Sequence, residues 1–237
     1  MCRLVVLMVL CALAGSGFAS DSGWQVTAVI SAGRANIDHI TDHDTIGTGQ
    51  VIVGLVDGQI AESSTHDTVA GIGIALGRSI GAWNLELETM WRYRTDWDLT
   101  VPTPSIRTLT NVFTNIETTS ILLNAVRERP LSGPWSYELG VGLGLVWNRT
   151  DSSYIERDEP SINFLEQIFD DKNSELDFAW NLIAGVKREL TGPWSLGFRY
   201  RYVDLGRLNV GPYPSRNSRV SGDHASHELL IAISRSL

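Results

Sequence analysis

Cysteine is almost absent from this sequence, and its two cysteines, Cys2 and Cys11, lie close to the N-terminus. Basic residues are also few. Lysine and arginine number 19 against 27 acidic residues, and the net charge is -8. This balance argues against a nucleic-acid-binding protein, which would carry a basic face. After the N-terminal segment, no apolar run approaches the ~18 residues of a membrane-spanning helix. The sequence therefore excludes a helical membrane protein and a nucleic-acid partner.

The N-terminal segment has the pattern of a secretory signal. Arg3 supplies a basic start, residues 4–14 are apolar, and small residues follow at Gly17 and Ala19. This order is typical of a cleaved signal peptide, and the apolar run is shorter than the ~20 residues of a spanning helix. We expect 1–19 to be a signal peptide and 20–237 to be a single domain. A mature chain cut after Ala19 would hold no cysteine, disulfide or reactive thiol.

The rest of the chain alternates between apolar and polar residues. In 83–96 most odd positions are apolar and most even ones polar, beginning Trp83, Asn84, Leu85, Glu86. Alternation over such a length predicts a strand with one apolar and one polar face, longer than the ~5–6 residues usual in soluble proteins. Eight segments share the pattern: 24–37, 67–79, 83–96, 113–127, 135–147, 176–187, 194–202 and 225–237.

The connections between these segments alternate in length. Short glycine turns are predicted near 81, 128–134 and 190–193, and long loops near 38–66, 97–112, 149–174 and 205–224. Short turns on one rim and long loops on the other are typical of outer membrane barrels. We predict an all-β fold: an eight-stranded antiparallel up-and-down transmembrane β-barrel with four long extracellular loops and short periplasmic turns. A soluble β-sandwich would also alternate.

Tryptophans at both ends of the predicted strands favour the barrel over the sandwich. Indole has an apolar body and one N–H donor, so it settles where lipid meets water. A sandwich has no reason to place aromatic residues at both strand ends. We predict two interfacial belts, one near the short turns and one near the long loops, formed by Trp24, Trp83, Trp135 and Trp194 and by Trp91, Trp147 and Trp180.

The polar face predicts a charged lumen. An eight-stranded barrel is just wide enough for side chains to fill it, and charges away from water need partners. A salt-bridged plug is one interpretation, and an ion pathway is the other. A turn at 81–82 would place Gly71 opposite Arg92 and Gly77 opposite Glu86, which leaves room for the long side chains. The predicted lumen charges nearly cancel: Glu86, Glu88, Glu138, Asp177, Glu228, Arg92, Arg94, Lys187, Arg199 and Arg201.

Two runs, 133–144 and 197–206, resemble strands of opacity-type outer membrane proteins, within the wider group of outer membrane protein A-like barrels. With the signal, the resemblance covers the whole chain. It implies a bacterial outer membrane location and a role in surface adhesion, envelope integrity or small pores, and it implies no catalytic residues. One departure is the C-terminus: such proteins usually end in phenylalanine after an outward alternation, whereas this chain ends in Leu237 and Arg235 breaks the alternation.

The histidines are weak candidates for a metal site. Because the first strand would lie between the second and the eighth, all five are expected on one side of the outer rim, beside several aspartates. Imidazole with carboxylate could hold a borderline metal or sense pH. A solvated polar loop is the plainer interpretation, so no metal and no cofactor is predicted. The five residues are His39, His43, His66, His224 and His227.

The long loops are the predicted interaction face. In 149–174, the segment 161–169 could form a short helix with Ile162, Leu165 and Phe169 on one face, and 51–58 could form a hairpin. The predicted partners are outer membrane lipids, lipopolysaccharide and a host or environmental ligand, with a monomeric barrel. The predicted function is structural or surface-interacting. A narrow diffusion pore is the alternative. A lipid-modifying enzyme is a third class, although no serine–histidine spacing singles out a nucleophile.

Overall fold

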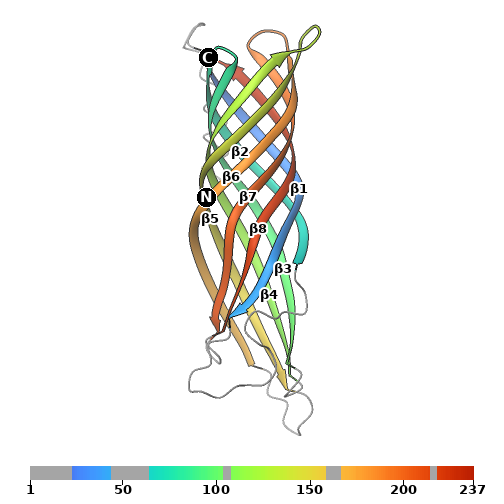
Figure 1. The fold of residues 1–237 in the computed structure, drawn as a ribbon, viewed down its shortest axis with the longest axis vertical. Coiled ribbons are helices and arrows are strands. Elements are labelled where there is room, and N and C mark those ends of the chain that lie inside the picture. The colour runs from blue at the N-terminus through green and yellow to red at the C-terminus, as the bar shows by residue number, and fades with distance from the viewer. Residues whose placement is uncertain (1–22, 44–63, 104–107, 159–166, 214–217) are drawn as a thin grey trace.

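The computed structural model describes residues 23–43, 64–103, 108–158, 167–213 and 218–237, which form one closed barrel (Figure 1). Each strand pairs antiparallel with the next, and β8 closes the barrel against β1. The predicted fold class is confirmed. Within the described residues, no helix is long and apolar enough to cross a membrane. The strands are β1 (Trp24–His43), β2 (Ser64–Ile80), β3 (Trp83–Thr103), β4 (Thr108–Pro130), β5 (Trp135–Asp158), β6 (Gln167–Glu189), β7 (Trp194–Tyr213) and β8 (Ser218–Ser236).

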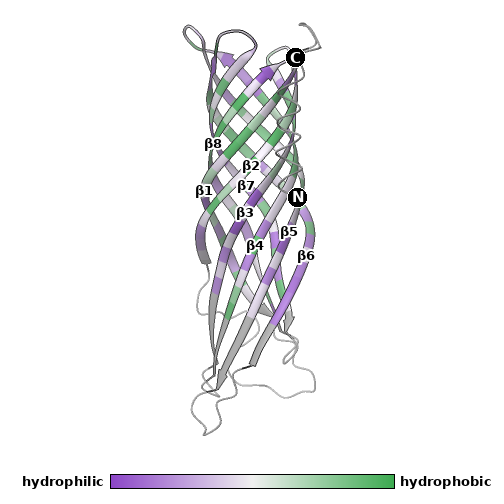
Figure 2. Cartoon of the chain, turned by 180° about the vertical axis from the view of Figure 1, so that it is seen from behind, coloured by the Kyte–Doolittle hydropathy of each residue, from purple (hydrophilic) through white to green (hydrophobic). Residues whose placement is uncertain are grey.

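The alternation of the sequence divides each strand between the outside and the lumen. On β5, Leu139 and Leu143 point outward and are 55% and 58% exposed, whereas Glu138 before them and Val146 after them are buried inside. Figure 2 shows the apolar residues concentrated in the half of the barrel that ends at the short turns. A band of exposed leucine, isoleucine, valine and aromatic side chains of this extent marks a surface that contacts lipid or another protein.

Three short turns at one end of the barrel each join two consecutive strands. They span 81–82, 131–134 and 190–193. Gly81, Gly133 and Gly192 have φ angles of 61°, 62° and 75° there, a left-handed conformation that costs glycine no strain. The turns predicted near 81 and at 190–193 are confirmed, whereas the one predicted at 128–134 is shorter because β4 continues to Pro130. The C-terminus lies at this same end (Figure 1).

At the opposite end the strands continue into segments predicted as loops. Residues 97–103 and 108–112 are strand, and so are most of 149–174 and 205–224. Cross-strand pairing extends through these polar segments because backbone hydrogen bonding does not require an apolar face. The predicted helix over 161–169 is wrong for 167–169, which begin β6; its earlier residues, like the predicted hairpin at 51–58, lie outside the described residues.

A β-bulge in β3 changes which side chains face the lumen. The register against β4 shifts between Arg92 and Thr95, so that one extra residue is inserted. Thr95 and Trp97 consequently point inward and are buried, whereas Arg94 points outward. The prediction that Arg94 faces the lumen is therefore wrong, because strict alternation cannot anticipate a bulge.

Candidate functional site

The lumen near the short turns holds a layer of charge centred on Arg199 of β7. Its guanidinium donates to Glu86 of β3, with Nη1 and Nη2 each 3.0 Å from a carboxylate oxygen, and to Glu138 of β5, with Nε 2.7 Å from Oε2. Asn84 adds a 2.7 Å hydrogen bond to Glu86. All four side chains are buried. One arginine thus ties together three strands that are far apart in the chain.

A second layer lies two residues further along β7, around Arg201. Its Nη1 pairs with Glu88 at 2.5 Å, and its Nη2 pairs with Glu228 of β8 at 2.6 Å. Arg92 of β3 shares Glu228 through Nε at 2.5 Å and also donates to Ser120 at 2.9 Å. The two layers together contain three arginines and four glutamates. The positive and negative charges buried in the lumen are therefore almost balanced, as buried ions require.

Apolar side chains fill the lumen beside and beyond the charges. Met90, Val29, Leu230 and Ala232 form one cluster next to the arginine layers. Two further clusters follow toward the outer end, one containing Leu122, Val146, Ala179, Val203 and Leu205 and the other Ile37, Ile40, Trp97, Val112, Ile116, Leu208, Val210 and Val220. The barrel interior is therefore a packed core over most of the described length, as expected for eight strands.

Seven of the ten predicted lumen charges meet in these layers, and three do not. Arg94 lies outside the barrel, 3.9 Å from Glu117. Asp177 accepts the backbone N–H of Arg207 at 2.7 Å, which holds a bulge in β7 instead of pairing with an arginine. Lys187 lies near the short turns and pairs with Glu128 at 3.0 Å.

Glu128 was missed by the sequence interpretation although its signal was present. The predicted strand ended at 127, three residues too early, and Glu128 continues the inward, even-numbered positions of β4. It accepts hydrogen bonds from Lys187 and from Ser136 at 2.7 Å.

The predicted partners of the two glycines are confirmed, but the side chains that use the space beside the glycines are not the predicted ones. Gly71 lies opposite Arg92 and Gly77 opposite Glu86. A Cβ at Gly71 would come within 2.8 Å of Met90 and Ser31, and one at Gly77 within 3.0 Å of Asn84 and Gln25. The glycines therefore make room for their direct partners on β1 and for diagonal neighbours on β3, and not for the charged residues opposite them on β3.

The five histidines do not form one cluster. His224 is buried in the lumen, whereas His227 of the same strand faces outward and bonds Tyr200 with Nδ1 2.6 Å from Oη. His39 lies 3.2 Å from Asp223, and His66 is exposed on β2. The side chain of His43 is not among those described. In the described part of the chain, no three histidine, cysteine or acidic side chains converge as metal ligands. The register places the described histidines on the neighbouring strands β1, β2 and β8, on one side of the barrel as predicted, but their side chains do not converge because successive strand residues point to opposite faces.

The tryptophans of both predicted belts face outward. Trp24, Trp83, Trp135 and Trp194 open strands at the short-turn end. Trp91 packs edge-on against Tyr93, and Trp180 packs against Tyr202, with ring centroids 5.7 Å and 5.4 Å apart. The remaining outer tryptophan, Trp147, is 38% exposed. All seven side chains therefore lie on the outer surface of the barrel, four at the short-turn end and three further along their strands.

A family model described as the outer membrane protein beta-barrel domain matches residues 3–224. The chain belongs to this family. It is accordingly a protein of the bacterial outer membrane, with the apolar band facing lipid and the short turns in the periplasm. The resemblance to outer membrane barrels drawn from the sequence is confirmed at the level of this family.

Solved structures of other outer membrane barrels are similar to this chain. Neisserial surface protein A shares 14% identity, with 92% of this chain and 100% of that chain covered and a TM-score of 0.49. The outer membrane protein AlkL shares 12%, with 93% of each chain covered and a TM-score of 0.45. Ail, the attachment invasion locus protein of Yersinia pestis, shares 10%, with 86% and 97% covered and a TM-score of 0.32. No curated protein sequence matches this chain.

Ser226 and His227 of β8 point to opposite faces of the barrel. Ser226 points into the lumen, where its hydroxyl donates to the backbone oxygen of Arg34 at 3.4 Å, whereas His227 faces the lipid. The protease OmpT of Escherichia coli is also among the similar solved structures, at 6% identity and a TM-score of 0.28.

Proposed function

We propose that this protein is a closed barrel that acts as a structural or surface-interaction protein of the outer membrane and does not conduct solutes. The observation that carries the proposal is the filled lumen. Two layers of buried ion pairs lie next to the apolar clusters, and Arg201, Glu88 and Glu228 have at most 1% of their surface exposed. A solute would have to break these pairs and displace packed side chains, so the outer surface is the part of the molecule available for function.

A narrow pore is the second candidate, and one observation favours it. Several buried polar atoms in the described residues have no hydrogen-bond partner, including both ring nitrogens of His224, Ser31 Oγ and Asn124 Nδ2. Buried polar groups normally bind protein or ordered water. These atoms would line a chain of water molecules if the apolar clusters opened.

Planar-bilayer recording distinguishes the two candidates. For the closed barrel, the refolded wild-type protein is expected to give no reproducible conductance steps, because the charges pair with each other and not with water. Variants Arg92→Ser and Arg201→Ser remove large side chains from the ion-pair layers. Conductance steps seen only in these variants would agree with a closed wild type. Reproducible steps from the wild type that disappear in these variants would establish the pore and refute the closed barrel.

The outer part of the barrel carries a polar hollow suited to surface contacts. It has a volume of about 400 Å³, and Arg94, Arg149 and Lys172 supply its positive charge beside Glu117 and Asp151. Lys172 pairs with Asp151 at 2.8 Å. The hollow lies further from the short turns than Trp147, where the outer leaflet meets water. Its excess of cations supports binding of lipopolysaccharide phosphates there.

Neutralising the hollow is expected to weaken this contact. In the triple variant Arg94→Gln, Arg149→Gln, Lys172→Gln, the rise in unfolding midpoint that lipopolysaccharide gives the wild type should fall to less than about half, since charge-assisted bonds to phosphate are lost. Urea titration of the refolded protein with and without lipopolysaccharide measures this rise in midpoint. Arg129→Gln, a neutralised exposed arginine at the opposite rim, is the control and should keep the full shift. An unchanged shift in the triple variant would remove the hollow from the proposed surface role.

A further inference from the structure

Four arginines lie over four tryptophans at the periplasmic end of the barrel. In the strand register the residues are direct partners: Trp24 with Arg78, Trp83 with Arg127, Trp135 with Arg188, and Trp194 with Arg235. Each guanidinium carbon lies 5.4 to 5.7 Å from the centroid of its ring, within the range of a cation–π contact.

The four pairs form a ring at one level. One pair belongs to each of the strand pairs β1–β2, β3–β4, β5–β6 and β7–β8, so the pairs are spread around the whole barrel. Every tryptophan is the first residue of its strand, and every arginine lies within three residues of the end of its own strand. The ring therefore lies where the lipid-facing band meets the periplasm. Arg235, which departs from the usual alternation of such C-termini, belongs to this repeat.

Arg78, Arg127 and Arg188 face outward and are exposed. Among the described residues, no ion pair involves Arg78, Arg127 or Arg188. In each pair the face of the tryptophan ring lies against the plane of the guanidinium. The N–H groups along the edge of the guanidinium stay available to another acceptor. At this depth the available acceptors are lipid phosphates, and two parallel N–H groups match two phosphate oxygens.

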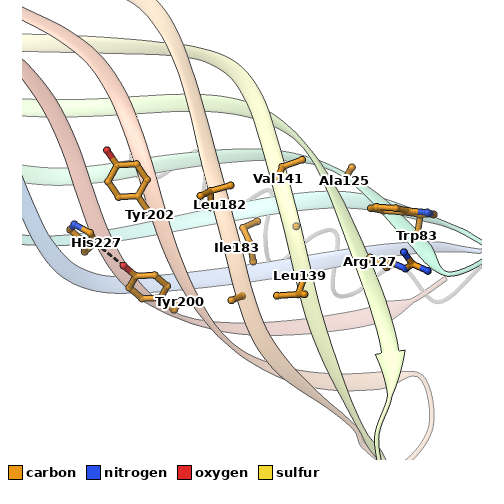
Figure 3. Close-up of a pocket in the computed structure, with 12 residues that line it drawn as sticks. Trp83, Ala125, Arg127, Leu139, Val141, Leu182, Ile183, Tyr200, Tyr202 and His227 are labelled. Carbon is orange, nitrogen blue, oxygen red and sulfur yellow. Dashed lines mark hydrogen bonds between the residues drawn. The ribbon is translucent and has the colours of Figure 1, made fainter.

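An apolar trough begins at one of the four pairs. It has a volume of about 650 Å³ and crosses the lipid-facing surface from Trp83 and Arg127 toward Tyr200, Tyr202 and His227 (Figure 3). Small side chains at Ala125 and Ala184 make the hollow, between the larger Leu139 and Leu182. Its lining is suited to a hydrocarbon chain and its periplasmic end to a phosphate.

We propose that the Trp–Arg ring binds phosphates of phospholipids in the periplasmic leaflet, and that Trp83, Arg127 and the adjoining trough together hold one phospholipid by headgroup and acyl chain. The ring fixes the depth of the barrel in the membrane from the periplasmic side. This inference is independent of whether the lumen conducts.

Native mass spectrometry of the refolded full barrel, released from detergent micelles containing dioleoylphosphatidylglycerol, tests the headgroup contact. The wild type is expected to retain the lipid. Arg127→Gln should lower the retained fraction at least about fivefold, because a charge-assisted contact to phosphate is lost. Arg129→Gln is the matched control: the residue is exposed on the same strand and lies over no tryptophan in the described structure, so retention should stay within about twofold. Equal retention by wild type and Arg127→Gln, or equal loss in both variants, would overturn the proposal.

A second variant tests the trough. Ala184→Trp fills the hollow from the lipid side, where an added apolar side chain does not disturb the lumen, and leaves Arg127 in place. Retention should fall at least about threefold because the acyl chain loses its contact surface. A large excess of inorganic phosphate should not displace the lipid from the wild type. If Ala184→Trp retains lipid like the wild type and phosphate displaces it, the site binds phosphate alone and the two-part phospholipid site is refuted.

Discussion

Arg201→Met is expected to lower the free energy of unfolding by about 3–5 kcal/mol, because it leaves Glu88 and Glu228 buried with one cation fewer. Methionine has a similar length and keeps most of the packing, so the loss reports the charge. Urea unfolding of the protein from phospholipid vesicles, followed by tryptophan fluorescence, measures the difference.

Two further variants separate charge from packing. Arg129→Met removes an exposed arginine, and its effect should stay below about 1 kcal/mol. Adding Glu88→Gln to Arg201→Met should recover part of the loss, because one unpaired carboxylate is removed. If Arg201→Met costs no more than Arg129→Met, the charges are hydrated, and the filled lumen that supports the closed barrel is wrong.

Gly144→Ala is expected to cost about 3 kcal/mol or to prevent refolding, because overpacking a rigid core is destabilising. A Cβ built at Gly144 lies 2.0 Å from the backbone oxygen of Ile121 on the neighbouring strand. A backbone atom cannot turn away as a side chain can, so β4 and β5 would have to separate. Refolding yield and urea midpoint in the same vesicles measure the effect.

Gly197→Ala provides the matched control. Gly197 is also an inward-facing strand glycine, but its Cβ would meet nothing closer than Ala232 at 3.5 Å, an ordinary contact. Alanine restricts the unfolded chain more than glycine does, so the change should be neutral or stabilising by up to about 1 kcal/mol. Similar losses in both variants would show that strand glycines are required for flexibility and not for the close approach of β4 and β5.

The position of each residue on the inner or outer face could be predicted wherever alternation was unbroken. Glu86, Glu138 and Arg199 were assigned to the lumen because the side-chain period of a strand is two, and the assignment fails only after a bulge, at Arg94. Asp177 faces inward as predicted, but its partner is the backbone N–H of Arg207 at a bulge in β7. No local sequence pattern predicts that bulge. The periodicity therefore indicates direction and leaves the partners open.

The strand count, the hairpin order and the aromatic levels follow from local features: alternation, glycine turns and tryptophans at strand ends, all of which act between residues near each other in the chain. The pairing of Arg199 with Glu86 and Glu138 required the closed barrel, whereas the pairing of Arg235 with Trp194 required only the register between β7 and β8. Closure and strand tilt bring together residues 113 and 61 positions apart, and their distance depends on the stagger of the whole sheet. Alternation is a property of each strand alone, whereas the lumen network and the Trp–Arg ring are properties of the assembled sheet.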